Sequence, residues 1–221
     1  DGDITSFTPD WIVRLVAPML DDDTVALVKA LSHRPTRLGG GGRTTLESAA
    51  DKLTLGGTVS VRQLNLFGEG DGEISGSVTN ASGYGLNKAG GGKWTIGGNM
   101  SNGTGVTIAG GTLQIGNGSS TGSLGTGAVV NNAALAFSRS DDLTVANAIS
   151  GTGTLSKLGT NTLTLTGLQT YTGATNVAGS LVFQNDVAPT TSGFTGTGAV
   201  TIEPVSSTFT AASLTSGYTF A

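Results

Sequence analysis

A motif in this chain recurs after about 70 residues, and this repetition restricts the fold more than any other feature. Leu86-Asn-Lys-Ala-Gly90 returns as Leu155-Ser-Lys-Leu-Gly159, and Gly111-Thr-Leu-Gln-Ile115 returns as Gly179-Ser-Leu-Val-Phe183. The spacing changes only slightly, and it changes inside loops rich in Gly, Asn and Ser. Repeats of this kind are typical of solenoids, in which loops absorb insertions.

From about Leu46 onward, apolar and polar residues alternate in short runs such as Leu53-Thr54-Leu55 and Val59-Ser60-Val61. This alternation predicts short β-strands with one face toward a core. The runs are separated by Gly or Asn, and Gly accounts for 37 of the 221 residues. Because Gly adopts the positive φ that tight corners need, the pattern favours a parallel β-helix. Three coils of roughly 23 residues would make one repeat unit.

The composition argues against several classes of protein. The chain has no Cys and a single His, which excludes disulfides, thiolate zinc sites and most histidine metal sites. A formal net charge of -4 argues against nucleic acid and anionic membrane surfaces as partners. The longest strongly apolar stretch, Ile12–Leu20, is too short for membrane insertion and is interrupted by Arg14 and Pro18.

Helix signals are confined to the start of the chain. Thr8 and Pro9 suit an N-cap and a first helical position, and an apolar face follows with every fourth residue: Trp11, Leu15 and Met19. Three consecutive Asp residues at 21–23 then predict the cap of a second short helix, whose apolar residues are spaced three apart: Val25, Val28 and Leu31.

The chain is therefore expected to have two parts. Residues 1–45 would form a helical element and a Gly-rich connector, and residues 46–221 a β-helix built of ~70-residue units. The helices would cover the open end of the solenoid, where backbone groups and apolar ladders are otherwise exposed.

The stretch from Gly151 to Gly173 reads GTGTLSKLGTNTLTLTGLQTYTG. It resembles the autotransporter passenger-associated β-strand repeat, in which a Gly-x-Gly-x-Leu-x-Lys-x-Gly start leads into a Thr-Leu-Thr-Leu-Thr-Gly strand and a Tyr-Thr-Gly turn. The resemblance continues through Phe183, and a degenerate copy runs from Leu86 to Ile115. It implies a right-handed parallel β-helix in an extracellular bacterial surface protein, and it implies no catalytic residues.

Motifs that suggest chemistry have simpler structural explanations. Gly118-Ser-Ser-Thr-Gly122 matches a nucleophile pattern, but it lacks a helix signal and the one histidine, His33, precedes it, so a turn is expected. Gly90-Gly-Gly-Lys93 lacks the spacing of a phosphate-binding loop and is expected at a corner between coils. Lys88 and Lys157 occupy equivalent repeat positions, which predicts a solvated site beside a turn.

Acidic residues are sparse in the later part of the chain, where the last four are Asp141, Asp142, Asp186 and Glu203. That number is too small for the exposed catalytic cleft of a polysaccharide-degrading β-helix. The acidic, Gly-containing clusters at 1–3 (Asp1 and Asp3) and 69–73 (Glu69 to Glu73) leave weak calcium binding open. We predict no catalytic residues, no cofactor and no structural metal.

These observations favour a non-enzymatic structural or adhesive segment of a secreted or surface-displayed bacterial passenger protein. Its expected partner is a host or neighbouring-cell surface. Two alternatives stay open: a subunit of a self-assembling extracellular fibre whose copies join end to end, and a β-helical polysaccharide-active enzyme.

Overall fold

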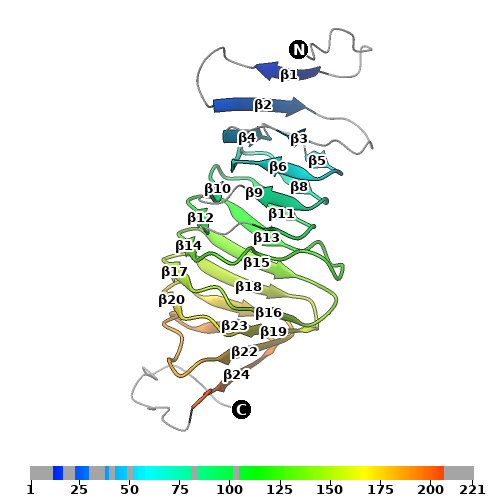
Figure 1. Cartoon of the computed structure of the whole chain (residues 1–221). Coiled ribbons are helices and arrows are strands. Elements are labelled where there is room, and N and C mark those ends of the chain that lie inside the picture. The colour runs from blue at the N-terminus through cyan, green and yellow to red at the C-terminus, as the bar shows by residue number, and fades with distance from the viewer. Residues whose placement is uncertain are drawn as a thin grey trace.

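All regular structure in the described part of the chain is β-strand. The computed structural model describes residues 12–16, 23–29, 38–39, 43–48, 52–80, 84–101 and 105–206. These residues contain no helix, and so none that is long and apolar enough to cross a bilayer. The strands form four sheets that run along one elongated stack (Figure 1).

The two largest sheets have nine and eight strands. The nine-stranded sheet contains, in spatial order, β1 (Ile12–Val16), β2 (Asp23–Lys29), β4 (Arg43–Glu47), β7 (Gln63–Phe67), β10 (Leu86–Lys88), β12 (Val106–Ile108), β14 (Val129–Asn131), β17 (Ile149–Gly151) and β20 (Gln169–Tyr171). The eight-stranded sheet contains β5 (Leu53–Leu55), β8 (Gly72–Ile74), β11 (Lys93–Ile96), β13 (Thr112–Ile115), β15 (Ala134–Ser138), β18 (Thr154–Leu158), β21 (Thr175–Val177) and β23 (Phe194–Gly196).

The remaining strands form a three-stranded and a four-stranded sheet. The first contains β3 (Leu38–Gly39), β6 (Val59–Val61) and β9 (Val78–Asn80). The second contains β16 (Leu143–Val145), β19 (Thr162–Leu165), β22 (Ser180–Gln184) and β24 (Ala199–Glu203). Between them in the chain, Met100 bridges back to Val78 and Ser123 to Asn99.

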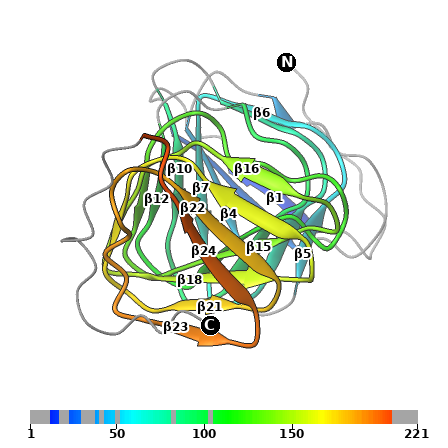
Figure 2. The same cartoon turned by 90° about the horizontal axis from the view of Figure 1, so that it is seen from below.

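Successive coils of the chain stack in parallel. From β4 onward the chain crosses the nine-stranded sheet, the eight-stranded sheet and then a smaller sheet or its bridges, and these faces enclose one interior (Figure 2). Register partners belong to successive coils, as Leu163 with Leu181 and Val106 with Val129 show. The result is a parallel β-solenoid of about eight turns, which confirms the predicted all-β solenoid.

The repeat seen in the sequence relates strands of different faces. Leu86 lies in the nine-stranded sheet, whereas Leu155 lies in the eight-stranded sheet. In the same way, Leu113 belongs to the eight-stranded sheet and Leu181 to the four-stranded sheet. The shared motif is therefore a local unit of strand and corner, which the chain uses at more than one position around the coil.

The interior is filled by apolar side chains stacked coil on coil. In the eight-stranded sheet, Leu113, Leu135 and Leu155 are register partners, and all three are fully buried. Stacked coils are spaced by about 4.8 Å, so a side chain of one coil packs directly on its equivalent in the next. Burial of apolar area at roughly 25 cal/mol per Å² makes these ladders the main stabilising contribution.

Glycines allow close approach of coils at the places where a side chain would collide. Gly68 has φ of +103°, and a Cβ there would lie 1.9 Å from the carbonyl oxygen of Ser48 in the preceding coil. Gly72 is the register partner of Trp94, and a Cβ on Gly72 would lie 2.4 Å from the indole ring. The absent side chain of one coil thus makes room for the largest side chain of the next.

The predicted helices at the start of the chain are not found. Ile12–Val16 and Asp23–Lys29 are the strands β1 and β2, paired as an antiparallel hairpin, and β2 continues in parallel onto β4. The Ile, Val and Thr residues of these segments are β-branched, and this favours an extended backbone over a helix. The predicted N-cap at Thr8-Pro9 and the residues around His33 lie outside the described part of the chain.

Truncation of one buried ladder residue should destabilise the whole stack. Leu135→Ala would remove apolar contacts on both sides and leave a cavity, so the free energy of unfolding should fall by about 2–5 kcal/mol. The matched control is Thr107→Ala on the exposed side of β12, which should change it by less than about 0.5 kcal/mol. Urea denaturation followed by circular dichroism measures both. Equal effects of the two changes would contradict the buried-ladder assignment.

Candidate functional site

The outer side of the nine-stranded sheet presents a column of mostly uncharged polar side chains. Each of these residues occupies the outward position in the middle of its strand, half-buried or exposed: Thr45, Asn65, Asn87, Thr107, Val130, Ser150 and Thr170. Thr and Asn tolerate a water-facing position in a sheet and avoid the repulsion that stacked like charges would cause. The column runs along the outer surface of the described part of this sheet.

Amide side chains are concentrated at the N-terminal end of this column. Asn87 Nδ2 donates to Asn65 Oδ1 at 3.1 Å, and Asn65 Nδ2 lies 3.5 Å from Thr45 Oγ1. Gln63 Nε2 also lies 3.5 Å from Asn65 Oδ1. We call the surface formed by β4, β7 and β10 around this ladder the amide face; its members are Thr45, Gln63, Asn65, Phe67 and Asn87.

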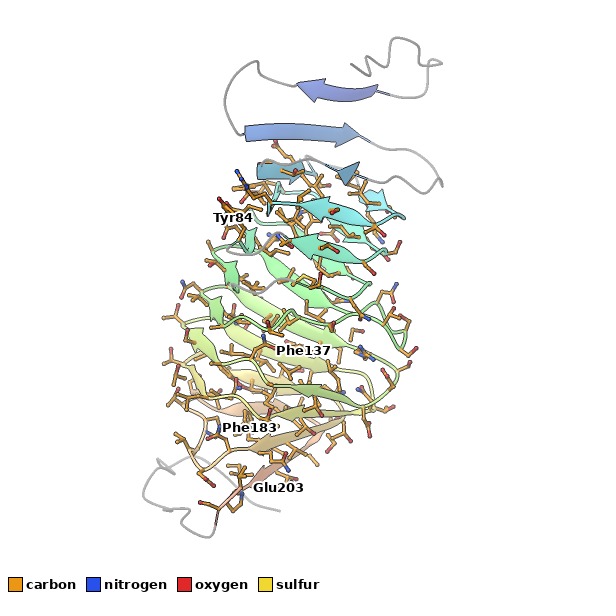
Figure 3. The ribbon with its side chains drawn as sticks, in the orientation of Figure 1. Tyr84, Phe137, Phe183 and Glu203 are labelled. Atoms are coloured by element: carbon orange, nitrogen blue, oxygen red, sulfur yellow. The ribbon has the colours of Figure 1, made fainter. Side chains whose placement is uncertain are left out.

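Aromatic residues lie at both ends of the amide face. Phe67, at the end of β7, is 39% exposed, which is unusual in a chain with only 5% aromatic residues. At the opposite border, the guanidinium carbon of Arg62 lies 5.1 Å from the centroid of the Tyr84 ring. Figure 3 places Tyr84 at the outer edge of the stack near its N-terminal end. Such a cation–π contact orders both side chains at the surface.

Carboxylates at the corners bind backbone amides of the next coil. The N–H groups that donate to them belong to residues one coil further along the chain: Gly91 to Glu69, Lys93 to Asp71, Thr162 to Asp142 and Val205 to Asp186, at 2.7–3.0 Å. Charge-assisted hydrogen bonds of this kind fix the stacking of corners. These four acids therefore have structural partners.

Glu73 makes a different contact. It accepts a hydrogen bond from the Lys52 ammonium and lies 3.3 Å from Asn117 Nδ2. The Lys52 contact holds the pKa of Glu73 below its ordinary value. In the described residues, no three His, Cys, Asp or Glu side chains are grouped to hold a metal ion. The cluster at 69–73 is thus occupied by protein partners, and Asp1–Asp3 lie outside the described residues.

The Gly118–Gly122 segment is a loop between β13 and β14, which confirms the predicted turn. Arg139 holds this loop: it donates to the carbonyl oxygens of Ser120 and Gly122 at 2.6 and 2.7 Å. The same guanidinium contacts both carboxylate oxygens of Asp141 at 2.7–2.8 Å. This hydrogen bonding lowers the pKa of Asp141. Arg139 and Asp141 therefore fix a surface loop.

The prediction that Lys88 and Lys157 are solvated is wrong. Lys88 is fully buried, and its ammonium donates to the carbonyl oxygens of Ala89, Gly90 and Gly110 at 2.8–2.9 Å. A lysine can be buried when three acceptors satisfy its three N–H bonds. The ammonium therefore holds the corner after its own strand, and Gly110 extends the contact to the next coil.

Lys157 repeats this arrangement at a corner of the eight-stranded sheet. It is 1% exposed and donates to the carbonyl oxygens of Leu158 and Gly159 and to Asn161 Oδ1, at 2.7–3.1 Å. Burial lowers the pKa of both lysine amines. Nearby carboxylates partly oppose this shift: Glu69 and Asp71 for Lys88, and Asp142 for Lys157. The Leu-x-Lys-x-Gly motif is thus a structural corner. The corner predicted at Gly90–Lys93 is confirmed, with φ of +76° at Gly90.

A buried hydroxyl network near the C-terminal end has no signal in the sequence pattern. Tyr171 is fully buried, and its hydroxyl lies 2.7 Å from Thr175 Oγ1. Thr175 Oγ1 in turn donates to Thr191 Oγ1 at 3.0 Å. The Tyr-Thr-Gly turn of the repeat is therefore fixed from inside the solenoid. The contact between Thr175 and Thr191 could have been predicted only from the coil spacing, because the two residues lie in different coils.

A shallow groove of about 650 Å³ follows one corner of the solenoid. It is lined by small residues of successive coils, including Gly57, Gly76 and Gly98, with Asn99 and Thr121 at one end. A Cβ on Gly76 would lie 2.1 Å from the carbonyl oxygen of Gly57, so tight backbone stacking alone explains the glycines. The groove is a consequence of this stacking.

Comparison with known proteins gives a similarity to an adhesin. No family model and no solved structure matches the chain. Over 53 residues, the chain is 57% identical to a protein named Adhesin BmaC autotransporter from Brucella suis biovar 1 (strain 1330). That stretch is 24% of this chain and 2% of the adhesin. The similarity agrees with the β-solenoid and with the resemblance to autotransporter passengers, over a short part of the chain.

Removal of a buried ammonium should weaken the solenoid. Lys157→Met keeps most of the side-chain volume but removes the donor of three hydrogen bonds at the corner, so the free energy of unfolding should fall by about 1–3 kcal/mol. The matched control is Lys93→Met, because the Lys93 side chain is exposed, and it should cost less than about 0.5 kcal/mol. Urea denaturation measures the difference; an unchanged midpoint for Lys157→Met would contradict the burial.

Acid should release the loop that Arg139 holds. The pKa of Asp141 is lowered in the folded protein, so its stabilising contact is present above the ordinary pKa of 3.8 and is lost as the pH falls through the lower folded value. The backbone amides of residues 119–122 should therefore lose protection against hydrogen exchange once the pH is well below 3.8. Their loss of protection should be larger than that of amides in other loops. Arg139→Gln should cause the same loss at neutral pH. Protection that survives both changes would contradict this role.

Proposed function

We propose that this chain is a rigid, non-enzymatic adhesive segment of a bacterial passenger protein displayed on the cell surface or secreted. In this proposal the solenoid is a right-handed parallel β-helix, extracellular, whose outer faces contact a host or neighbouring-cell surface. The observation that carries it is the stack of about eight parallel coils with fully buried apolar ladders and uncharged polar columns outside. The 57% identity to an autotransporter adhesin over 53 residues supports the same function.

Several carboxylates form hydrogen bonds or ion pairs within the protein, and this supports a non-enzymatic function. General acid–base catalysis needs carboxylates with free oxygen atoms that can reach a substrate. In the described residues, Glu69, Asp71 and Asp142 accept backbone N–H groups, and Asp141 pairs with Arg139. These contacts give the four acids a structural role at the corners, which supports the proposal.

The alternative function is a subunit of an extracellular fibre. It is favoured by the C-terminal edge of the described solenoid, where β23 and β24 are the last strands of their sheets. Val200 and Ile202 of β24 are only half-buried, whereas their register partners Leu181 and Phe183 are fully covered. A sheet edge with apolar residues is suited to contact with another copy.

Direct measurement of cell binding tests the proposed function. Beads coated with the purified chain should bind cultured epithelial cells or bacterial layers well above albumin-coated beads, and soluble chain should compete. Heat-unfolded chain on beads is the control, because the contact surface exists only in the stacked coils. Absence of competable binding to both kinds of cell would refute adhesion.

Light scattering after size-exclusion chromatography separates the alternatives. A monomer at all concentrations fits an adhesive segment within a longer passenger, whereas a mass that grows with concentration fits a fibre subunit. Release of reducing ends from neutral or acidic glycans would instead indicate an enzyme.

A further inference from the structure

We infer that the amide face is a binding surface for a neutral oligosaccharide. This inference rests on the proposed adhesive function and names the chemical class of its partner. The amide face combines a hydrogen-bonded ladder of Thr45, Asn65 and Asn87 with the partly exposed ring of Phe67.

The amides supply hydrogen-bonding groups suited to sugar hydroxyls. Each Asn carries two N–H donors and a carbonyl oxygen with two acceptor positions. The ladder bonds between Asn87, Asn65 and Thr45 use part of this capacity and hold the amides in a fixed row, both asparagines being half-buried. Because the row is ordered before binding, little side-chain entropy is lost when a ligand replaces water.

The aromatic borders supply the apolar part of the surface. A pyranose ring has an apolar face of C–H groups, which packs on the face of an aromatic ring, where the quadrupole is negative. Phe67 follows Asn65 by two positions on β7, so the exposed ring and the amides share the outer side of one strand. Tyr84, ordered by Arg62 at the other border, limits the surface along the strand. From Gln63 to Phe67 the strand spans about 13 Å, enough for a di- or trisaccharide.

The charges point to an uncharged ligand. Between Arg62 at one border and Glu47 at the other, the ladder residues carry no charge. Glu47 is the register partner of Phe67, so a negative charge lies beside the exposed ring and disfavours an anionic sugar there. Around these uncharged residues stand charges of both signs, with Glu47 at one end of β4, Arg43 at the other as the register partner of Gln63, and Arg62 beside Tyr84. Such a surface favours a neutral partner over one with many charges of one sign.

Binding to defined oligosaccharides tests this inference. The full chain is titrated with lactose, N-acetyllactosamine, maltotriose and cellotriose, with sialyllactose as the acidic probe, and binding is followed by calorimetry and by ¹H–¹⁵N spectra of the asparagine side chains. At least one neutral probe should bind and shift the Asn65 and Asn87 amide signals. The double substitution Asn65→Ala with Asn87→Ala should weaken binding at least about tenfold, and Phe67→Ala roughly fivefold.

The matched control is Asn176→Ala. Asn176 also belongs to an outward amide ladder, donating to Thr195 Oγ1 at 3.1 Å, but it lies in the eight-stranded sheet. Its substitution should leave binding within about twofold. Circular dichroism checks that every variant keeps its fold.

Three results would overturn the inference: no neutral probe binds, only sialyllactose binds, or the variants substituted on the amide face bind the sugar as tightly as the Asn176→Ala variant. If cells still bind the chain in any of these cases, the adhesive function stands and its contact surface lies elsewhere. If a neutral probe binds at Asn65 and Asn87 but no cell does, the surface is a sugar site and the adhesive function falls.

Discussion

The in-register parallel hydrogen bonding of successive coils is the interaction on which the rest of this structure depends. Each strand residue is placed on its equivalent in the next coil, at about the 4.8 Å spacing of adjacent strands. Similar environments then stack: apolar on apolar inside, hydroxyl or amide on hydroxyl or amide outside. Like charges stacked in such a column would repel each other. The described acids lie mainly at corners, where a backbone N–H of the next coil donates a hydrogen bond to them.

The fold class was predictable from sequence because a period-two pattern broken by glycine indicates both the strand and the corner. The helix prediction at the start of the chain rested on capping residues, whereas the β-branched residues of Ile12–Val16 and Asp23–Lys29 favour strands. These two strands pair with each other, and the second extends the sheet at β4. The helix propensity of one short segment determines its structure less strongly than the hydrogen bonds that the segment can form with a sheet edge.

Burial of the lysines was not predictable from residue type. Lysine is ordinarily exposed, and its three acceptors here are mainly backbone carbonyls, which no sequence pattern reveals. The equivalence of Lys88 and Lys157 was visible, but its meaning depended on how the corner folds back on the ammonium. Similarly, the members of the amide face come from strands of different coils, so their assembly required the coil register. Sequence alone indicated that the outer surface was polar, but it did not show where amides and a phenyl ring would meet.

The same corner motif occurs on different faces of the solenoid, and this determines where its copies lie on the outer surface. Because one repeat leads from Leu86 in the nine-stranded sheet to Leu155 in the eight-stranded sheet, copies of the motif point in different directions around the axis. If a solenoid is lengthened by duplication of this segment, equivalent corners come to lie on different faces around its axis. Equivalent corners of such a rod therefore lie on different faces and do not form a single column.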